Sequence, residues 1–337
     1  MRLIPMLALF LLACGPEPES ATESPVEAQS QNRIPVIFDT DANNELDDQH
    51  ALAYLVWNDE TFDVRGITTN ATVSGGEIAL HDAEAERILK LTQREDIPLH
   101  RGANANFPEI RTTLDQSDYD GHAAVDFMIE QSRAVDSLVL LAVGKLTNVA
   151  LAAAKDPTIS ERVRLVWLGS NYPEPGEYNQ DGDPDALRYL LDSTNMPFEM
   201  VTVRYGQGTG TDAVTITQDE VNDLFPGKGP RIAQPITGRH GGEYATFGDY
   251  AVNLFQHIDY YSDPPKRALF DQAAVAVVKN PDWAQRRTLP APQLRDTVWV
   301  ERPDNARTIL LYENFNREAI IGDFLETLER VSPSDDE

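Results

Sequence analysis

The chain has 337 residues, with 28 lysines and arginines against 55 aspartates and glutamates, which gives a formal net charge of −27. A chain this acidic is repelled by phosphate backbones and by anionic lipid headgroups, so the composition disfavours a nucleic-acid-binding protein. The one cysteine, Cys14, excludes an intramolecular disulfide.

Residues 1–14 have the features of an export signal. One positive charge precedes an apolar run far shorter than the roughly 20 residues that a spanning helix needs. The segment Leu11-Leu12-Ala13-Cys14 resembles the lipobox of bacterial lipoproteins, in which the cysteine is lipidated. We therefore expect an exported cell-envelope lipoprotein on the periplasmic face, attached to the membrane only through Cys14, and Gly15 is compatible with the outer membrane. Residues 15–32 are polar and form a disordered tether.

Residues 33–337 show no linker-like break and no internal repeat, so we expect one folded domain. Apolar runs predict strands at 34–38, 64–68, 138–143, 163–168 and 198–203. Helical patterns are found at 45–57, 76–93, 122–133, 146–154, 184–194, 246–260, 269–279 and 315–330. This alternation predicts an α/β fold, a single domain with a mostly parallel central sheet and helices on both of its faces.

The first apolar run ends in an acidic loop with five carboxylates within ten residues, namely Asp39, Asp41, Glu45, Asp47 and Asp48. Carboxylates this dense repel one another unless a cation lies among them or some stay protonated. Capping of a helix N-terminus is the simpler alternative, but it uses only one or two of them. Oxygen ligands without a nearby cysteine or histidine favour calcium or magnesium, and the number of carboxylates favours Ca2+.

Polar side chains also follow later strands of the predicted sheet. Asn70 and Ser74 follow the second strand, where they either reach the acidic loop or only cap a turn. Asn171, Glu177 and Asn179 follow the run 163–168. In open parallel sheets, ligands bind beyond the carboxyl ends of the strands, and Asp39 and Asp41 fall at such an end. Asp183-Pro184 predicts a helix start, with Asp as the N-cap.

Four stretches together resemble the inosine-uridine-preferring nucleoside hydrolase family. They are the Asp-x-Asp with a following Asp-Asp at 39–48, the Gly-x-Leu-Thr-Asn turn at 144–148, the Glu-aromatic-Asn and Asp-Pro-x-Ala pair within 177–186, and an Asp at the start of the helix 269–279. One departure is visible, because five residues separate Asp41 from Asp47 where the common family pattern has three. The extra length falls in Asn43-Asn44-Glu45.

The resemblance implies a Rossmann-like nucleoside hydrolase fold and calcium-dependent hydrolysis of the N-glycosidic bond of ribonucleosides, which releases base and ribose. In the family, one carboxylate is both a metal ligand and the base that activates water, which here is Asp41. The implied metal ligands are Asp41, Asp48, Asp271, the carbonyl of Val143, and Asp39. The implied substrate contacts are Asp47, Asn70, Asn171, Glu177 and Asn179.

The resemblance leaves the group that activates the leaving base open. Pyrimidine-tolerant family members have a histidine where this chain has Phe270, which cannot donate a proton, so the substitution favours purine nucleosides. The glycine-rich segment 226–248 is typical of a mobile flap, and its His240 is our candidate catalytic acid. Tyr244, His122 or stacking on an aromatic ring are alternatives. Residues 102–121 predict a long loop over the site.

Two other functions fit the same residues. One is a calcium-dependent lipoprotein that binds a nucleoside or sugar without turnover, and the other is a hydrolase of a different N-ribosyl compound. In each case the partner is a small molecule, and the sequence leaves a homo-oligomer open.

Overall fold

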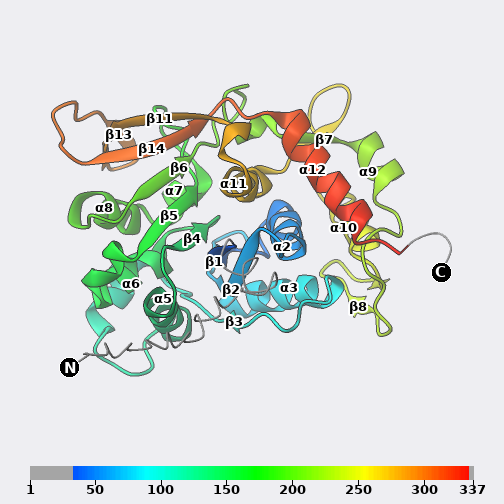
Figure 1. Ribbon diagram of the computed structural model, residues 1–337, viewed down its shortest axis with the longest axis horizontal. Helices are drawn as coiled ribbons and strands as arrows, with labels where there is room; N and C mark the ends of the chain where they lie inside the picture. Colours follow the sequence, from blue (N-terminus) through cyan, green and yellow to red (C-terminus); the bar gives the residue numbers. More distant parts are fainter. Residues whose placement is uncertain (1–32, 334–337) are drawn as a thin grey trace, which may run out of the picture. The chain divides into compact units, whose positions relative to one another are not determined.

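Strand β1 (Ile34–Thr40) lies inside an eight-stranded sheet with the order β11-β14-β6-β5-β4-β1-β2-β3 (Figure 1). The structure is a computed structural model and describes residues 33–333. Neighbouring strands of this sheet are parallel, except that β11 is antiparallel to β14 at one edge. The other strands are β2 (Phe62–Thr69), β3 (Leu99–His100), β4 (Leu138–Ala142), β5 (Val163–Leu168), β6 (Phe198–Val201), β11 (Gln285–Pro290) and β14 (Thr308–Glu313).

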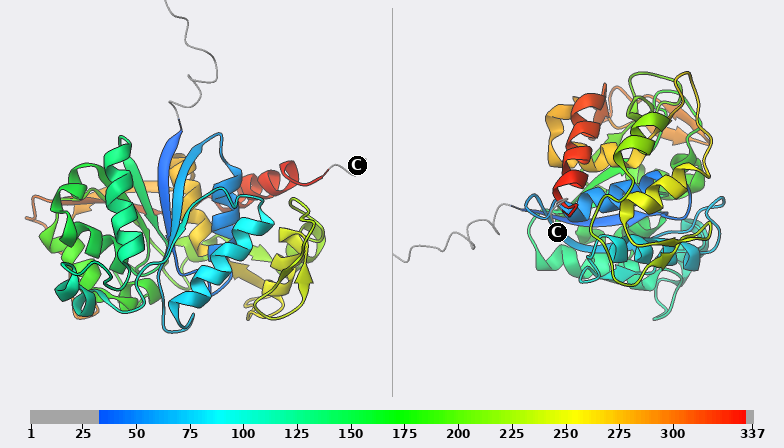
Figure 2. Two further views of the ribbon diagram at one scale, coloured as in Figure 1. Left: turned by 90° about the horizontal axis from the view of Figure 1, so that it is seen from below. Right: turned by 90° about the vertical axis from the view of Figure 1, so that its right-hand side faces the viewer.

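Helices cover both faces of the sheet, as Figures 1 and 2 show. One hydrophobic core contains residues of α2 (Asp47–Trp57), α3 (Ile78–Leu91), α10 (Phe247–Phe255), α11 (Phe270–Lys279) and α12 (Arg317–Arg330). The other contains residues of α4 (Phe107–Ile110), α5 (His122–Ala134), α6 (Thr147–Lys155) and α8 (Pro184–Ser193). The short helices α7 (Tyr178–Gly182) and α9 (Gln218–Leu224) complete the set of α-helices in the described residues.

The central strand β4 is apolar at every position, and β1 is apolar along most of its length, because both faces of the sheet are covered there. Val36 and Phe38 of β1 belong to one core, whereas Ile37 between them belongs to the other, and all three are fully buried. The same alternation holds along β4, where Leu140 and Leu141 point to opposite cores. The predicted α/β fold, a single domain with a mostly parallel sheet between two helical layers, is confirmed.

The start of helix α8 lies where the Asp183-Pro184 sequence predicts it. Asp183 accepts a hydrogen bond from the backbone N of Ala186 (3.1 Å), and Pro184 is the first residue of α8, as expected. At the end of β1, Thr40 Oγ1 donates to Asp48 Oδ1 (2.5 Å), which ties the strand to the first turn of α2. The acidic loop therefore runs from a buried strand directly into a buried helix.

Several elements were not anticipated from the sequence. The run 308–313 forms β14, and its antiparallel partner β11 alternates too weakly in polarity to be recognised, with four exposed residues at its start. Three two-stranded pairings also form between short segments: β7 (Thr215–Thr217) with β10 (Lys266–Ala268), β8 (Ile236–Thr237) with β9 (Glu243–Tyr244), and β12 (Gln293–Arg295) with β13 (Val298–Val300).

Within residues 33–333, no helix combines the length and the apolar character needed to cross a membrane. The predicted export signal, the lipidation site Cys14 and the tether lie outside the described residues.

Candidate active site

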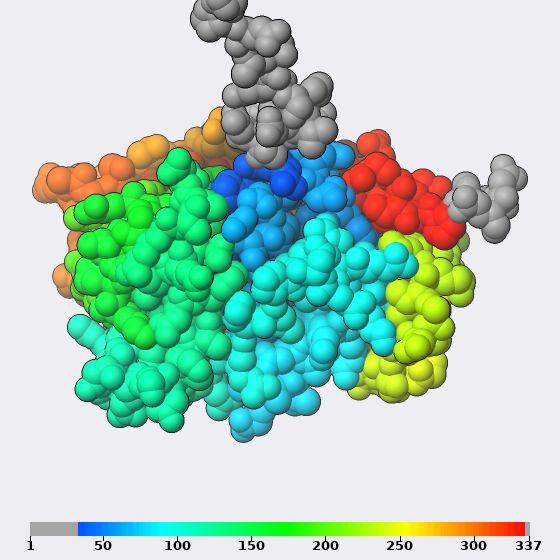
Figure 3. Space-filling view, turned by 60° about the horizontal axis from the view of Figure 1, so that its bottom comes forward, coloured from blue at the N-terminus to red at the C-terminus, as the bar shows by residue number. Residues whose placement is uncertain are grey.

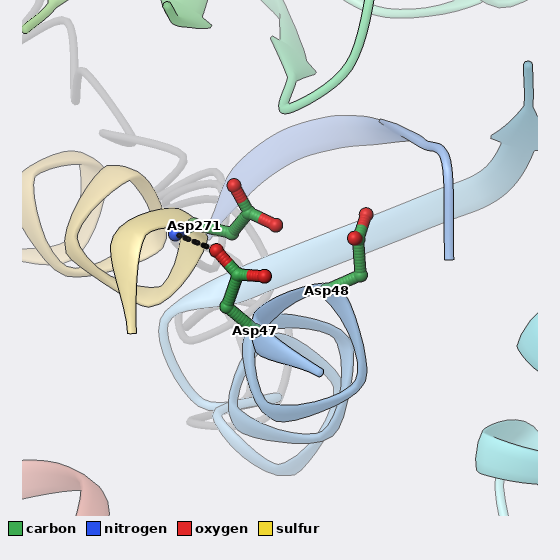
Figure 4. A group of neighbouring side chains, drawn as sticks. All are labelled: Asp47, Asp48 and Asp271. Carbon is green, nitrogen blue, oxygen red and sulfur yellow. Dashed lines mark hydrogen bonds between the residues drawn. The ribbon is translucent and has the colours of Figure 1, made fainter. Parts of the chain in front are cut away.

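Three carboxylates from two helices point toward one another beyond the carboxyl end of the sheet (Figure 4). Asp47 and Asp48 lie in the first turn of α2, and Asp271 lies in the first turn of α11. One oxygen of each carboxylate lies within 4.8 Å of the others, and all three residues are buried. The backbone N of Asp271 also donates to Asp47 Oδ2 (3.4 Å), so the two helix starts are directly joined.

Asp41 lies close to this group, at the end of β1. Its Oδ2 is buried and has no hydrogen-bond partner in the described part of the chain. Burial, followed by the charges of Asp48 and Asp47, raises the pKa of Asp41 well above its ordinary value. Burial and neighbouring acidic groups raise the pKa of Asp47 and of Asp271 in the same way, and burial raises that of Asp48 to about 6. The site therefore brings together carboxylates whose ionised forms are disfavoured by burial and by one another, and the charges of Arg267 and Arg239 offset this only in part.

The donor set fits a hard divalent cation. Four carboxylates and the carbonyl of Val143 line one space, and calcium takes oxygen ligands of these two kinds. The Val143 carbonyl accepts a hydrogen bond from Asn179 Nδ2 (2.7 Å), and a carbonyl oxygen has a second lone pair for a metal. The backbone next to Val143 comes close to the carboxylates, because a Cβ on Gly144 would lie 2.8 Å from Asp41 Oδ1.

These groups form part of a cavity of about 310 Å³, which we call the acidic cavity. Glu177 and Asn179, expected to bind the sugar, both line it. Glu177 is buried and caps α7, and its Oε2 accepts from the backbone N of Ser170 (2.8 Å) and of Gln180 (2.9 Å). Burial raises the pKa of Glu177. The lining also includes Phe270, whose ring meets Tyr205 edge to face at 5.7 Å between centroids.

Asp39 does not line the acidic cavity, although it was expected among the metal ligands. Its Oδ1 accepts from Thr68 Oγ1 (2.6 Å) and Asn148 Nδ2 (2.8 Å), and its Oδ2 accepts from Asn70 Nδ2 (3.2 Å). Both oxygens are therefore engaged inside the protein. We correct the ligand set accordingly, and Asp39 joins the ends of β1 and β2 to α6.

Asn70 and Asn171 also lie behind the cavity lining. Asn70 is fully buried and contacts Asp39 rather than the cavity. Asn171 Oδ1 accepts from the backbone N of Tyr205 (3.1 Å), and its Nδ2 donates to the carbonyl of Gly176 (2.5 Å). This amide holds two loops together, and Asn171 is not part of the cavity lining.

The structure does not bring His240 into the acidic cavity. The side chain is exposed, its ring stacks on His257 at 4.3 Å, and its Nε2 accepts from Arg239 Nε (3.1 Å). His122 is exposed at the start of α5 and contacts the carbonyl of Tyr119 through Nδ1 (3.0 Å). Neither histidine lines the cavity, and the third candidate, Tyr244, does not line it either.

The segment 226–248 nevertheless reaches the acidic loop. Arg239 Nη2 donates to the carbonyl of Glu45 (2.5 Å). On its other side, Arg87 Nε of α3 donates to the carbonyl of Thr237 (2.9 Å), and Figure 3 shows the yellow-green segment beside the cyan region that contains α3. The expected flap is thus anchored between α3 and the acidic loop.

The predicted loop 102–121 borders a neighbouring cavity of about 590 Å³, with Tyr178 between this cavity and the acidic one. Lys145 is buried beside it, and its Nζ donates to the carbonyl of Ala105 (3.0 Å) and to Asn106 Oδ1 (2.7 Å). The loop therefore packs around Lys145, and none of its residues lines the acidic cavity.

The acidic cavity is also lined by a second set of residues that was not predicted from the sequence. We call them the rim of the acidic cavity: Glu45, Tyr205, Asp212, Tyr261 and Arg267. They lie in loops and in a three-residue strand, so no periodic pattern marks them. Glu45 was counted among the five carboxylates of the acidic loop and in its extra length, but its pairing was not foreseen: its carboxylate forms an ion pair with Arg267 Nη2.

The fold and the site together define a nucleoside hydrolase. The profile of the inosine-uridine preferring nucleoside hydrolase family matches residues 36–317, and the chain belongs to this family.

The chain is also similar to individual proteins and solved structures. The chain is 27% identical over 214 residues to an uncharacterised Schizosaccharomyces pombe protein, covering 55% of the chain and 66% of that protein. It is 29% identical over 230 residues to the probable uridine nucleosidase 2 of Arabidopsis thaliana, covering 60% of the chain and 67% of that protein. Among solved structures, the plant nucleoside hydrolase PpNRh1 has a similar fold, with a TM-score of 0.68, 20% identity, and coverage of 88% of this chain and 99% of that one.

Proposed function

We propose that the protein hydrolyses the N-glycosidic bond of ribonucleosides in a calcium-dependent reaction. The observation that carries this proposal is the buried group of Asp41, Asp47, Asp48 and Asp271 in a cavity with Glu177 and Asn179. A cavity of about 310 Å³ has the size of a small-molecule site. Family membership supports the same reaction.

Calcium held by Asp41, Asp48, Asp271 and the Val143 carbonyl would supply positive charge that orients ribose hydroxyls and lowers the pKa of a water molecule. The chain itself supplies the base, because Asp41 Oδ2 is free to accept a proton from the attacking water. The water oxygen bonds to C1′ as the bond from C1′ to the base nitrogen breaks, and the electron pair of that bond leaves with the base. Asp47, Glu177 and Asn179 hold the sugar.

We also propose that purine nucleosides are preferred. Phe270 lies where pyrimidine-tolerant relatives have a histidine, and its edge-to-face contact with Tyr205 gives the cavity an aromatic corner. A flat apolar wall of this kind favours the larger purine ring. The Arabidopsis relative, a probable uridine nucleosidase, points to the other class of base.

The test is ribose release by the purified protein from inosine, adenosine, guanosine, uridine and cytidine, with calcium and after chelation. We expect release that requires calcium and is faster for the purine nucleosides. If calcium binds tightly and none of the five is cleaved, the protein is a binding protein or acts on another N-ribosyl compound. Release that is insensitive to chelation would contradict the metal assignment.

We further propose that the protein is exported and anchored in the cell envelope through a lipid on Cys14. The lipobox-like segment before Cys14 supports this location. Incorporation of a radiolabelled fatty acid in a bacterial host, and its loss in the Cys14→Ser variant, tests it.

A further inference from the structure

Two residues of the rim, Tyr261 and Arg267, are held next to each other by the backbone. Arg267 lies in β10, and residue 261 pairs with the neighbouring residue 266 in an isolated antiparallel bridge. The backbone N of Tyr261 donates to the carbonyl of Lys266 (3.1 Å), and the backbone N of Lys266 donates to the carbonyl of Tyr261 (3.0 Å). Both Tyr261 and Arg267 line the acidic cavity.

Each of these residues has one buried polar atom that the protein leaves unpaired. Tyr261 Oη and Arg267 Nε have no hydrogen-bond partner among residues 33–333. A buried group of this kind costs about 1–3 kcal/mol when it stays unsatisfied. Both atoms belong to side chains that line the acidic cavity, so a bound ligand that brings hydrogen-bond acceptors to these side chains would relieve this cost.

The guanidinium of Arg267 is fixed by the acidic loop. Glu45 forms an ion pair with Arg267 Nη2, and Arg267 Nη1 donates to the carbonyl of Asp259 (3.4 Å). Glu45 belongs to the part of the loop that is longer than the common family pattern. Two of the guanidinium nitrogens are thus used for positioning, and Nε remains for a ligand.

Tyr261 is a donor throughout the neutral pH range. Burial, followed by the charge of Asp212, raises the pKa of Tyr261 to about 12, so the hydroxyl keeps its proton. Asp212 accepts from the backbone N of Gly206 (3.0 Å) through Oδ2. The rim therefore offers one charged and one neutral donor within the cavity that contains the carboxylates.

We propose that Arg267 Nε and Tyr261 Oη stabilise the negative charge that develops on the nucleobase as its bond to C1′ breaks, with Glu45 as a positioning residue for Arg267. This inference rests on the proposed nucleoside hydrolysis. The base leaves with the electron pair of the broken bond, both donors keep their protons, and the departing base takes its proton from water. Fixed donors aimed at developing charge are among the largest contributions to catalysis.

The proposal explains how the chain can act without an acid at the family position. Phe270 cannot donate a proton, and His240 is exposed outside the cavity. The donors on the rim supply electrostatic stabilisation instead of a transferred proton.

The test compares two leaving groups. Inosine releases a base that needs stabilisation, whereas 4-nitrophenyl β-D-ribofuranoside releases a nitrophenolate that leaves without it. We expect the Arg267→Met variant to lower kcat for inosine about 100-fold and Tyr261→Phe to lower it about tenfold. Both variants should keep the rate for the nitrophenyl riboside within about twofold of the wild-type rate, which also shows that they fold and bind metal.

Matched controls come from neighbouring positions outside the cavity. Tyr260 packs on Phe255, and Arg286 pairs with Asp282 at the exposed edge of the sheet. We expect the Tyr260→Phe and Arg286→Met variants to cleave both substrates at the wild-type rate. A loss with these controls as large as with the rim variants would overturn the proposal.

The positioning role of Glu45 has its own readout. We expect Glu45→Gln to lower kcat for inosine more than it changes KM, and to leave the rate for the nitrophenyl riboside unchanged. Glu45→Asp keeps the ion pair and should therefore recover part of the kcat for inosine. Equal losses for both substrates in the Arg267 and Tyr261 variants would overturn the inference and leave the proposed function intact. A wild-type protein that cleaves neither riboside would refute both together.

Discussion

The acidic cavity has two parts that are built differently. Its floor, which we define as Asp41, Asp47, Asp48 and Asp271, comes from the end of a central strand and from the first turns of two buried helices. Its rim comes from loops, from a 3₁₀ turn and from β10, which pairs with β7 and, through an isolated bridge, with residue 261. The floor is therefore tied to the sheet, whereas the rim depends on segments that can change length without disturbing the core.

The two parts also differ in their electrostatics. The floor collects carboxylates whose pKa values are raised by burial and by one another. On the rim, the Glu45 carboxylate is paired with Arg267, whose pKa is raised mainly by that partner against the effect of burial. The floor thus has the kind of ligands that a divalent cation takes, whereas the rim combines an ion pair with uncharged polar side chains.

The largest expected effect comes from removing the base on the floor. We expect Asp41→Asn to lower kcat about 1000-fold, because the amide cannot take the proton of the attacking water. Steady-state kinetics on inosine measures the loss, and circular dichroism checks the fold. A variant that retains more than a tenth of the wild-type activity would show that another group is the base.

Calcium should stabilise the floor strongly. At 100 times its Kd, a ligand that binds only the native state adds about 2.7 kcal/mol to the free energy of unfolding. We expect the melting temperature to rise by roughly 5–10 °C with calcium and to fall back after chelation.

The Asp47→Asn variant sharpens this prediction. Without calcium it should be more stable than the wild type by about 1 kcal/mol at pH 7, because it removes a carboxyl group whose ionised form is disfavoured by burial and by its neighbours. The gain on adding calcium should be smaller than in the wild type. The rim variant Asp212→Asn should show the wild-type response to calcium. An altered response in this variant would show that the rim also contributes to calcium binding.

Glycine substitutions compare the packing beside the floor with that of an open position outside the cavity lining. In Gly144→Ala, the new Cβ would lie 2.8 Å from Asp41 Oδ1 and 2.7 Å from Asn70 Oδ1, both of which are buried. We expect a loss of about 1–3 kcal/mol of stability. Gly208 has no atoms within 4 Å of its added Cβ, and Gly208→Ala should be neutral in chemical denaturation. Similar stability of both variants would mean that the backbone beside the floor can shift.

The smallest effect concerns base preference. Phe270→His introduces a proton donor into the aromatic corner of the cavity. We expect the ratio of kcat/KM for uridine to that for inosine to rise by about tenfold, since an acid helps the poorer leaving group more. An unchanged ratio would show that Phe270 does not determine the choice of base.

The sequence was a good guide to the floor because the sheet determines where its residues meet. Asp47 and Asp48 follow a buried strand, and the density of carboxylates there pointed to them. Asp271 begins an apolar helix, and only the family resemblance distinguished it from a simple helix cap. Asp39 was harder to assign, because a two-residue alternation along β1 gives the direction of a side chain and not its hydrogen-bond partners. Thr68 and Asn148, which occupy its oxygens, lie 29 and 109 residues away.

The rim could not be predicted for a different reason. Tyr261 and Arg267 lie in a polar stretch without periodicity, and their significance depends on buried atoms that lack partners, which only three-dimensional packing reveals. His240 was chosen from composition alone, since a histidine in a glycine-rich segment carries no information about which way its ring points. Strand β14 was not predicted from the sequence, because its six residues form a short run between a polar stretch and the helix that follows.

The longer acidic loop has a mechanical consequence. The carbonyl of Glu45 accepts a hydrogen bond from Arg239, and its carboxylate pairs with Arg267, so one residue connects segments 194 and 222 positions further along the chain. This residue lies between Asp41 and Asp47 of the floor. Glu45 therefore connects the loop between two floor residues to both arginines, so a substitution that displaces this loop should move the carboxylates of the floor and the arginines together.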